Sequence, residues 1–106
     1  METFLIYAWF NFPDGESATY NICITKNLDR AKNICRKLND KWYELRELDM
    51  EEDEKNKIFH ELTTELNIKY NAIDYEDYSE EYEFAFERVD VLPELEDKLD
   101  KVLNEN

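Results

Sequence analysis

The first 25 residues place apolar side chains at the two-residue period of β-strands. Residues 4–10 ("FLIYAWF") are apolar on both faces and rich in β-branched and aromatic types, as is typical of a central strand. Residues 18–25 ("ATYNICIT") alternate, and one face is expected to carry Ala18, Tyr20, Ile22 and Ile24. Between them, Pro13-Asp14-Gly15 is a turn signal because glycine accepts a positive φ without steric cost. The pattern predicts a β-hairpin.

The spacing then changes to the three and four residues of an amphipathic helix. Asn27 is a suitable N-cap, and the helix is predicted over residues 28–45. Its apolar stripe is Leu28, Ala31, Ile34, Cys35, Leu38 and Trp42.

A second helix is predicted to follow residues 49–52 ("DMEE"). This segment resembles a capping box, in which Asp49 and Glu52 would satisfy free backbone N–H groups reciprocally. The residues expected to face inward are Ile58, Phe59, Leu62, Leu66 and Tyr70.

Residues 81–91 ("EYEFAFERVDV") alternate again and predict a third strand. Pro93 can open a last short helix with Leu95, Leu99, Val102 and Leu103 inward, because proline is tolerated in a first turn. The expected fold class is α+β: an N-terminal β-hairpin and a third antiparallel strand, with about three helices packed on one face of the sheet, in the order β-β-α-α-β-α. A length of 106 residues fits a single compact domain spanning 1–106.

The net charge of the chain restricts the classes of molecule that it is expected to bind. The chain has 27 acidic and 13 basic residues, a net charge of −14. Residues 1–48 hold seven of each sign, so the whole excess lies in residues 49–106. Such a negative field disfavours direct binding of nucleic acid or of an anionic membrane surface. It favours a basic protein surface, with an affinity that falls as salt rises.

Cysteine usage and hydropathy point to the cytoplasm. Cys23 and Cys35 form no C-x-x-C motif, and the longest apolar run has seven residues, too few for a membrane span. We therefore expect reduced thiols and a cytoplasmic protein.

No residue pattern predicts catalysis, a metal site or a cofactor. His60 is the sole histidine, and neither cysteine has the signature of a nucleophile, so a boundary histidine is the favoured interpretation. A Ca²⁺ loop of the EF-hand type needs a glycine at its turn, and the chain has none after Gly15. We expect a non-enzymatic protein without metal or cofactor. A small enzyme, the remaining alternative, would require a pocket around His60.

The segment 72–83 ("AIDYEDYSEEYE") is the candidate partner-binding surface, with six carboxylates and three tyrosines in twelve positions. Carboxylates along a surface can imitate phosphates toward arginine forks, and tyrosine supplies rigid contact area. In the alternative interpretation, Tyr75, Tyr78 and Tyr82 fasten a loop to the core while the acids face water. The predicted contact residues are Asp74, Tyr75, Glu76, Asp77, Tyr78, Glu80, Glu81 and Glu83.

A resemblance supports the first interpretation. The opening "FLIYAWFNFPDGESATYNICITKNLDRAKNIC" resembles the start of short phage and mobile-element proteins, in which two strands lead through a capped segment, here Leu28-Asp29-Arg30-Ala31, into a helix. In length and acidity the chain is similar to anti-CRISPR proteins and related phage inhibitors of host defence. The resemblance implies a protein–protein inhibitor, in some cases a DNA mimic, and it carries over no site residue.

Two hypotheses follow. In the first, the chain is a non-enzymatic inhibitor that binds the basic, nucleic-acid-binding surface of a host protein, such as a CRISPR–Cas effector or another defence nuclease. In the alternative, it is a small phage or bacterial accessory domain that works through homo- or hetero-oligomerisation, with charge serving solubility only and with Trp9, Trp42 and Tyr43 as contacts. The sequence is compatible with a monomer or a homodimer.

Overall fold

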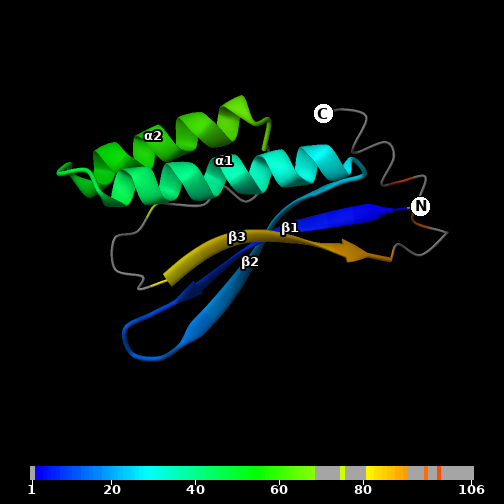
Figure 1. Ribbon diagram of the computed structural model, residues 1–106, viewed down its shortest axis with the longest axis horizontal. Coiled ribbons are helices and arrows are strands. Elements are labelled where there is room, and N and C mark those ends of the chain that lie inside the picture. The colour runs from blue at the N-terminus through cyan, green and yellow to red at the C-terminus, as the bar shows by residue number, and fades with distance from the viewer. Residues whose placement is uncertain (1, 69–74, 76–80, 91–94, 96–97, 99–106) are drawn as a thin grey trace.

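Three antiparallel strands and two helices make up the described part of the chain. The structure, a computed structural model, describes residues 2–68, 75, 81–90, 95 and 98. The elements are β1 (Thr3–Asn11), β2 (Ser17–Thr25), α1 (Leu28–Arg46), α2 (Glu52–Glu65) and β3 (Glu81–Val89). Both helices lie on the same face of the sheet (Figure 1). The predicted α+β class with a hairpin and a third antiparallel strand is confirmed.

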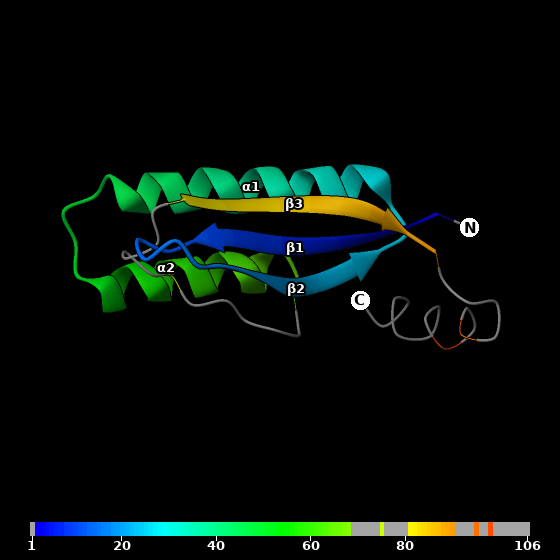
Figure 2. The same cartoon turned by 90° about the horizontal axis from the view of Figure 1, so that it is seen from below.

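β1 is the central strand of the sheet, whose order is β2-β1-β3. Its apolar character on both faces fits this position. On the helix side, Phe4, Ile6, Ala8 and Phe10 are buried, at 6% exposure or less. On the opposite side, Leu5, Tyr7 and Trp9 are partly exposed, and no described element covers them (Figure 2). At the hairpin turn, Gly15 has a φ of 89°, as the turn signal predicts.

The predicted alternation along β2 fails after Ile22, which is itself buried as predicted, with 3% exposure. Ile6 pairs with Cys23 but the next residue, Tyr7, pairs with Asn21, so Ile22 is an extra residue in the strand, a β-bulge. A one-residue insertion moves every later side chain to the other face. Thr25 therefore shares the face of Phe4 and is buried, whereas Ile24 lies on the opposite face with 38% exposure.

Tyr20 departs from the expected core for a different reason. It pairs with Ala8 on the helix side, yet it is 55% exposed. The tip of the hairpin bends away from the helices, so no helix lies above this part of β2 (Figure 1). Tyr20 instead packs its ring against Phe10, with centroids 5.1 Å apart.

α1 buries the predicted stripe against the sheet. Ala31, Ile34, Cys35, Leu38 and Trp42 are each 7% exposed or less, and the side chain of Asn27 caps the helix by accepting from the backbone N–H of Arg30 at 3.1 Å. Leu28 is the exception at 38% exposure. It is the first residue of the helix, where the chain has only just left β2.

α2 begins without the predicted capping box. Its N-cap is Glu51 rather than Asp49, and no side chain caps the helix; only the Glu51 carbonyl accepts from Glu54 and Lys55. The position of the cap explains the difference, because the carboxylates of Asp49 and Glu52 no longer stand at N-cap and N3. Phe59, Leu62 and Leu66 are buried as predicted, and Ile58 is partly buried. Tyr70 lies outside the described residues.

Two of the three predicted helices lie in the described ranges. The last predicted helix falls on residues outside these ranges, apart from Leu95 and Lys98, and both of these residues are helical. Leu95, predicted to face inward, is 43% exposed.

Candidate partner-binding surface

Only part of the predicted contact segment belongs to the described residues. Asp74, Glu76, Asp77, Tyr78 and Glu80 lie outside them. Glu81 begins β3, and Glu83, two residues along the strand, has an exposed side chain. Tyr75 is described on its own, between the two undescribed stretches.

Tyr75 is a core residue, with 2% exposure. Its ring lies 4.5 Å from that of Trp42, centroid to centroid, and its backbone N–H donates to Asn56 Oδ1 at 2.9 Å. The Lys55 ammonium stands over the same ring at 5.5 Å. For Tyr75, the structure therefore supports the alternative in which a tyrosine fastens the segment to the core, and it leaves no ring surface there for a partner.

Tyr82 has the same role one strand position before Glu83. It is 3% exposed and stacks on Trp42 with centroids 3.7 Å apart. It also stacks on Phe10, with centroids 5.3 Å apart. Trp42 itself is 1% exposed, so this tryptophan is not available as a surface contact either.

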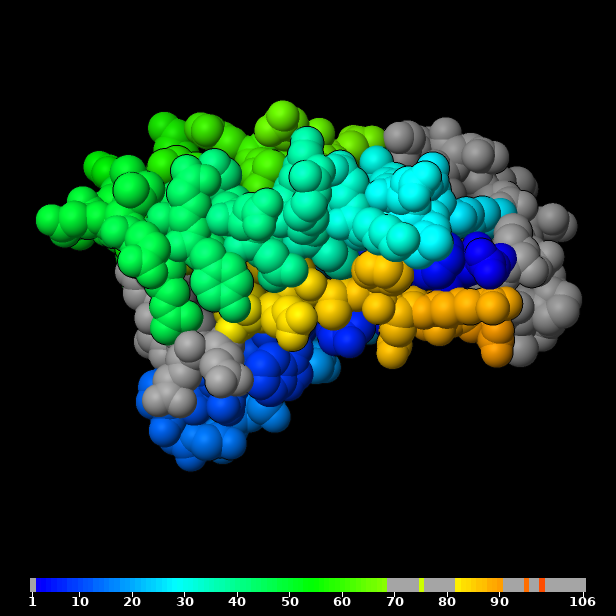
Figure 3. Space-filling model, viewed as in Figure 1, coloured from blue at the N-terminus to red at the C-terminus, as the bar shows by residue number. Residues whose placement is uncertain are grey.

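The densest group of described carboxylates lies where α1 leads into α2. We call residues 44–54 the acidic corner; it projects beyond the sheet at one end of the molecule (Figure 3). It contains one basic residue, Arg46, and seven carboxylates, all exposed: Glu44, Glu47, Asp49, Glu51, Glu52, Asp53 and Glu54. Glu44 pairs with Lys41 at 3.1 Å, and the acids in the first turn of α2 are favoured by the helix dipole.

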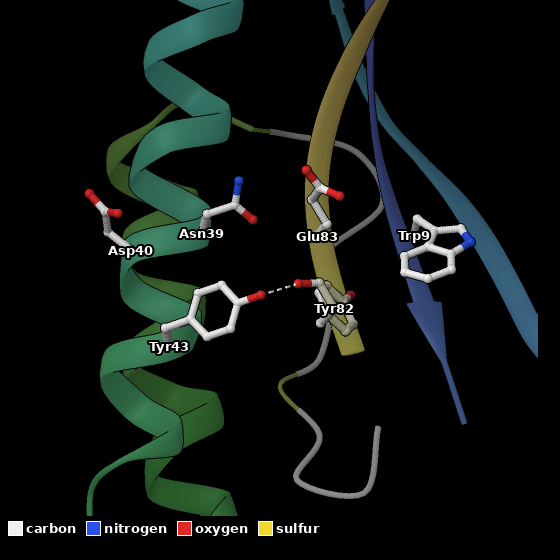
Figure 4. A pocket seen from close by; sticks show the side chains of 6 residues that line it. All are labelled: Trp9, Asn39, Asp40, Tyr43, Tyr82 and Glu83. Carbon is white, nitrogen blue, oxygen red and sulfur yellow. Dashed lines mark hydrogen bonds between the residues drawn. The ribbon is translucent and has the colours of Figure 1, made fainter. Parts of the chain in front are cut away.

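Beside the acidic corner, side chains of α1 form hydrogen bonds with the edge of β3 that does not pair with β1. The Asn39 side chain donates to the Phe84 carbonyl at 2.8 Å and accepts from the Phe84 N–H at 2.7 Å, as a neighbouring strand would. The Tyr43 hydroxyl donates to the Tyr82 carbonyl at 3.0 Å (Figure 4). An edge strand covered in this way does not offer these groups to another chain.

A groove of about 520 Å³ follows this edge, within the range of small-ligand sites. We call it the edge groove; it is lined by Trp9, Asn39, Asp40, Tyr43, Tyr82 and Glu83 (Figure 4). Trp9 and Glu83 are paired across β1 and β3, which puts both side chains on the uncovered face of the sheet. The groove thus combines two carboxylates with aromatic rings.

Glu83 is also a predicted partner contact, whereas the sequence pattern does not predict the rest of the groove as a site. Trp9 and Tyr43 appeared only among the contacts of the alternative hypothesis, and Asn39 and Asp40 were not singled out. The sequence indicates these helix residues only weakly, because "NDKWY" places polar residues beside the apolar stripe of α1 without marking any of them as part of a site. Because the groove joins three elements, only the register of β1 with β3 brings its walls together.

The remaining candidates for chemistry are the two cysteines and the histidine. Burial raises the pKa of Cys23 and of Cys35 to about 11, and nearby negative charge adds to the effect on Cys35. Neutral thiols of this kind are poor nucleophiles at pH 7. His60 is partly buried on α2. Among the described residues, no three histidine, cysteine or acidic side chains gather where they could hold a metal ion.

Neither helix in the described ranges has both the length and the apolar composition required to span a bilayer. No protein-family model matches the chain, and no curated protein and no solved structure is significantly similar to it.

Proposed function

We propose that the chain is a non-enzymatic acidic interaction protein that binds the basic, nucleic-acid-binding surface of another protein. A CRISPR–Cas effector or another defence nuclease is the partner class with the required cationic channel. Binding would exclude guide RNA or target DNA by competition, since arginine and lysine side chains recognise carboxylates and phosphates by the same hydrogen bonds.

The observation that carries the proposal is the excess of exposed carboxylates at one end of the molecule. In the acidic corner seven carboxylates accompany one basic residue, and the net charge of the chain is −14. Helix capping does not use these groups, because no side chain caps α2. An uncompensated field of this size steers a cationic partner to the surface and raises the association rate.

A cleavage assay tests the proposal. Purified Cas effectors of several types and several restriction endonucleases would be incubated with the protein before the target DNA is added. We expect inhibition of at least one nuclease, relieved by excess guide RNA or DNA. Inhibition should weaken as NaCl rises from about 50 mM to about 300 mM, because salt screens exposed charges.

Charge reversal identifies the surface that binds. Glu51→Lys with Asp53→Lys tests the acidic corner, and Asp77→Lys with Glu80→Lys tests the predicted segment. The variant of the surface that binds should reduce affinity for the inhibited nuclease at least tenfold. Glu61→Lys with Glu65→Lys is the matched control: it makes the same charge change at exposed positions near the end of α2 that lies away from the acidic corner. Equal affinity of the Asp77/Glu80 variant and the wild-type protein at low salt would reject the predicted segment, and no inhibition across the panel would reject the function.

The alternative, an oligomerising accessory domain, is favoured by one observation. Leu5, Tyr7 and Trp9 line the uncovered face of the sheet along its central strand (Figure 2). Apolar faces of this kind often mark protein interfaces. Sedimentation at two concentrations about a hundredfold apart separates the hypotheses, since a tight homodimer at both would support the alternative.

A further inference from the structure

The two outer strands of the sheet differ in how their edges are protected. β3 has four charged residues, and side chains of α1 form hydrogen bonds with its outer edge. β2 forms the opposite edge (Figure 2), and its nine residues include no charged residue and no proline. Natural edge strands usually carry such residues, because an unprotected edge pairs with other chains. In a chain with 38% charged residues, a neutral edge strand of this length is therefore an exception.

The backbone of β2 can form hydrogen bonds on its outer side. In an antiparallel sheet, the N–H and C=O groups of alternate residues point away from the neighbouring strand. Within the described part of the chain, no hydrogen bond outside the β1–β2 ladder reaches the backbone of residues 17–20 or 22–25. The bulge at Ile22 interrupts the alternation, so residues 17–20 are the regular part of this edge. We call residues 17–20 the open edge; another extended backbone matches the spacing of its donors and acceptors.

The surroundings of the open edge indicate which side chains would fit beside it. Tyr20 is 55% exposed, and its ring packs against Phe10 with centroids 5.1 Å apart. No helix lies above this part of β2, so the ring is accessible to a residue of an added strand (Figure 1). Aromatic and β-branched residues form favourable cross-strand pairs. At the other end of the open edge, the hairpin turn contributes Asp14 and Glu16, both exposed, which favour a lysine or an arginine.

We propose that the open edge accepts an extended segment of the partner protein as a fourth strand, with a β-branched residue against Tyr20 and a lysine or arginine beside the hairpin turn. The proposal rests on the proposed function, for which it names one contact with the partner. In strand addition, backbone hydrogen bonds supply affinity and alternate side chains supply specificity. A second copy of the chain fits less well, because it would bring another net charge of −14 to the same edge.

A peptide titration tests the open edge. The probe is the heptapeptide acetyl-Lys-Val-Thr-Val-Thr-Val-Lys-amide, and binding is followed by amide chemical shifts and hydrogen exchange in NMR spectra of the whole chain. We expect millimolar binding and about tenfold slower exchange of those amides of residues 17–20 that point away from β1. The same peptide N-methylated at its five central residues lacks the backbone donors and should not bind. The peptide with glutamate in place of lysine should bind several-fold more weakly.

Variants of β2 then locate the contact. Tyr20→Ala should weaken peptide binding about threefold, because a valine of the peptide loses its cross-strand contact. Ile24→Ala is the matched control: Ile24 is 38% exposed on the same strand but lies beyond the bulge and on the opposite face, and its loss should change affinity less than about twofold. Equal binding of the N-methylated and unmodified peptides, or equal effects of the two variants, would overturn the assignment. Protection of the same amides without peptide, lost on dilution, would assign the edge to a second copy and would also overturn it.

The two proposals fail in different ways. If the peptide protects the open edge but no nuclease is inhibited, the edge site stands and the proposed function is wrong. If a nuclease is inhibited equally by the wild-type protein and by the Tyr20→Ala variant, and the peptide protects no amide of β2, the function stands and strand addition is wrong.

Discussion

Among single residues, Thr3 leaves a polar group unsatisfied in the interior. It is fully buried, and its hydroxyl oxygen has no hydrogen-bond partner in the part of the chain that the structure describes. Thr3→Val replaces this hydroxyl with a methyl group of similar size and keeps the β-branch. We expect it to stabilise the fold by about 1 kcal/mol, because a buried unpaired hydroxyl is costly.

Thermal unfolding followed by circular dichroism would measure the effect, which corresponds to roughly 4–8 °C in a domain of this size. Thr19→Val is the matched control, an exposed threonine on the neighbouring strand β2, and it should change stability by less than about 0.5 kcal/mol. A destabilised Thr3→Val variant would show that the hydroxyl has a partner in solution.

The raised pKa values of the two thiols predict how their alkylation rate and the stability of the fold depend on pH. With a pKa of about 11 instead of 9.0, the thiolate fraction of Cys23 and Cys35 at pH 8 falls about 100-fold. Alkylation by iodoacetamide should therefore be about 100-fold slower in the folded protein than in urea, and its rate should rise through pH 10 without levelling off. Because the folded-state pKa is raised, the neutral thiols stabilise the fold below pH 9, and this contribution is lost as the pH rises toward 11.

Mass spectrometry of the alkylated protein at a series of pH values would assign the rate to each cysteine. A rate that levels off near pH 9 in the folded state would contradict the raised pKa values, whatever its absolute size, since restricted access alone does not move the midpoint.

At the residue scale, the segment 72–83 shows that composition alone does not determine which side chains are buried. Its composition predicts an exposed, charged surface, and Glu83 fits that prediction, but Tyr75 and Tyr82 are buried. Tyrosine suits both a core and an interface, because it has an apolar ring and a polar end. The choice depends on Trp42, which contacts both rings from a helix more than thirty residues away in sequence.

At the scale of elements, the strong periodicities predict β1, α1 and β3 to within about two residues at each end. They fail at the bulge of β2, because the extra residue Ile22 is visible only in the pairing of β2 with β1. They fail again at the start of α2, where a short run of acidic residues suits several cap positions. A local pattern gives the type of an element more reliably than its register.

The hydrogen bonds between the Asn39 side chain and the Phe84 backbone predict how much one side-chain amide stabilises the packing of α1 against β3. Asn39→Ala removes both bonds to Phe84 and leaves a part-buried N–H and C=O without these partners, which should cost about 2–4 kcal/mol. Asn39→Asp keeps an acceptor for the Phe84 N–H but places a carboxylate against the Phe84 carbonyl, so it should also destabilise. Urea denaturation would measure both changes.

Asn33→Ala is the matched control on the same helix. The Asn33 side chain accepts a bond from Arg36 at 2.9 Å on an exposed surface, and its loss should cost less than about 0.5 kcal/mol. Similar costs at the two positions would mean that water replaces Asn39 at the strand edge. The α1–β3 packing would then depend on the apolar contacts alone.

For the whole molecule, the sequence locates the excess charge in residues 49–106, and the structure adds a contribution from the neutral first half. Glu44 and Glu47 end α1 beside the acids that begin α2, so the acidic corner draws on both halves of the chain. The edge groove likewise joins β1, α1 and β3. Surfaces assembled from distant segments depend on topology, which a single sequence leaves open.

The charge of the whole molecule predicts an unusual response to salt. Exposed ion pairs such as Lys41–Glu44 and Glu2–Arg88 are each worth at most about 1 kcal/mol, and salt weakens them. Repulsion within a chain of net charge −14 opposes folding, and salt weakens that repulsion as well. With so large an excess of one sign, we expect the second effect to dominate.

The melting temperature should therefore rise by several degrees as NaCl increases from 10 mM to 150 mM, over which the Debye length shortens from about 30 Å to about 8 Å. MgCl₂ at equal ionic strength is the control, because a dedicated divalent site would raise the melting temperature further than screening does. A melting temperature that falls with NaCl would show that attractive pairs outweigh the repulsion. The excess carboxylates would then have cationic partners within the chain and would not be free to meet a basic surface on another protein.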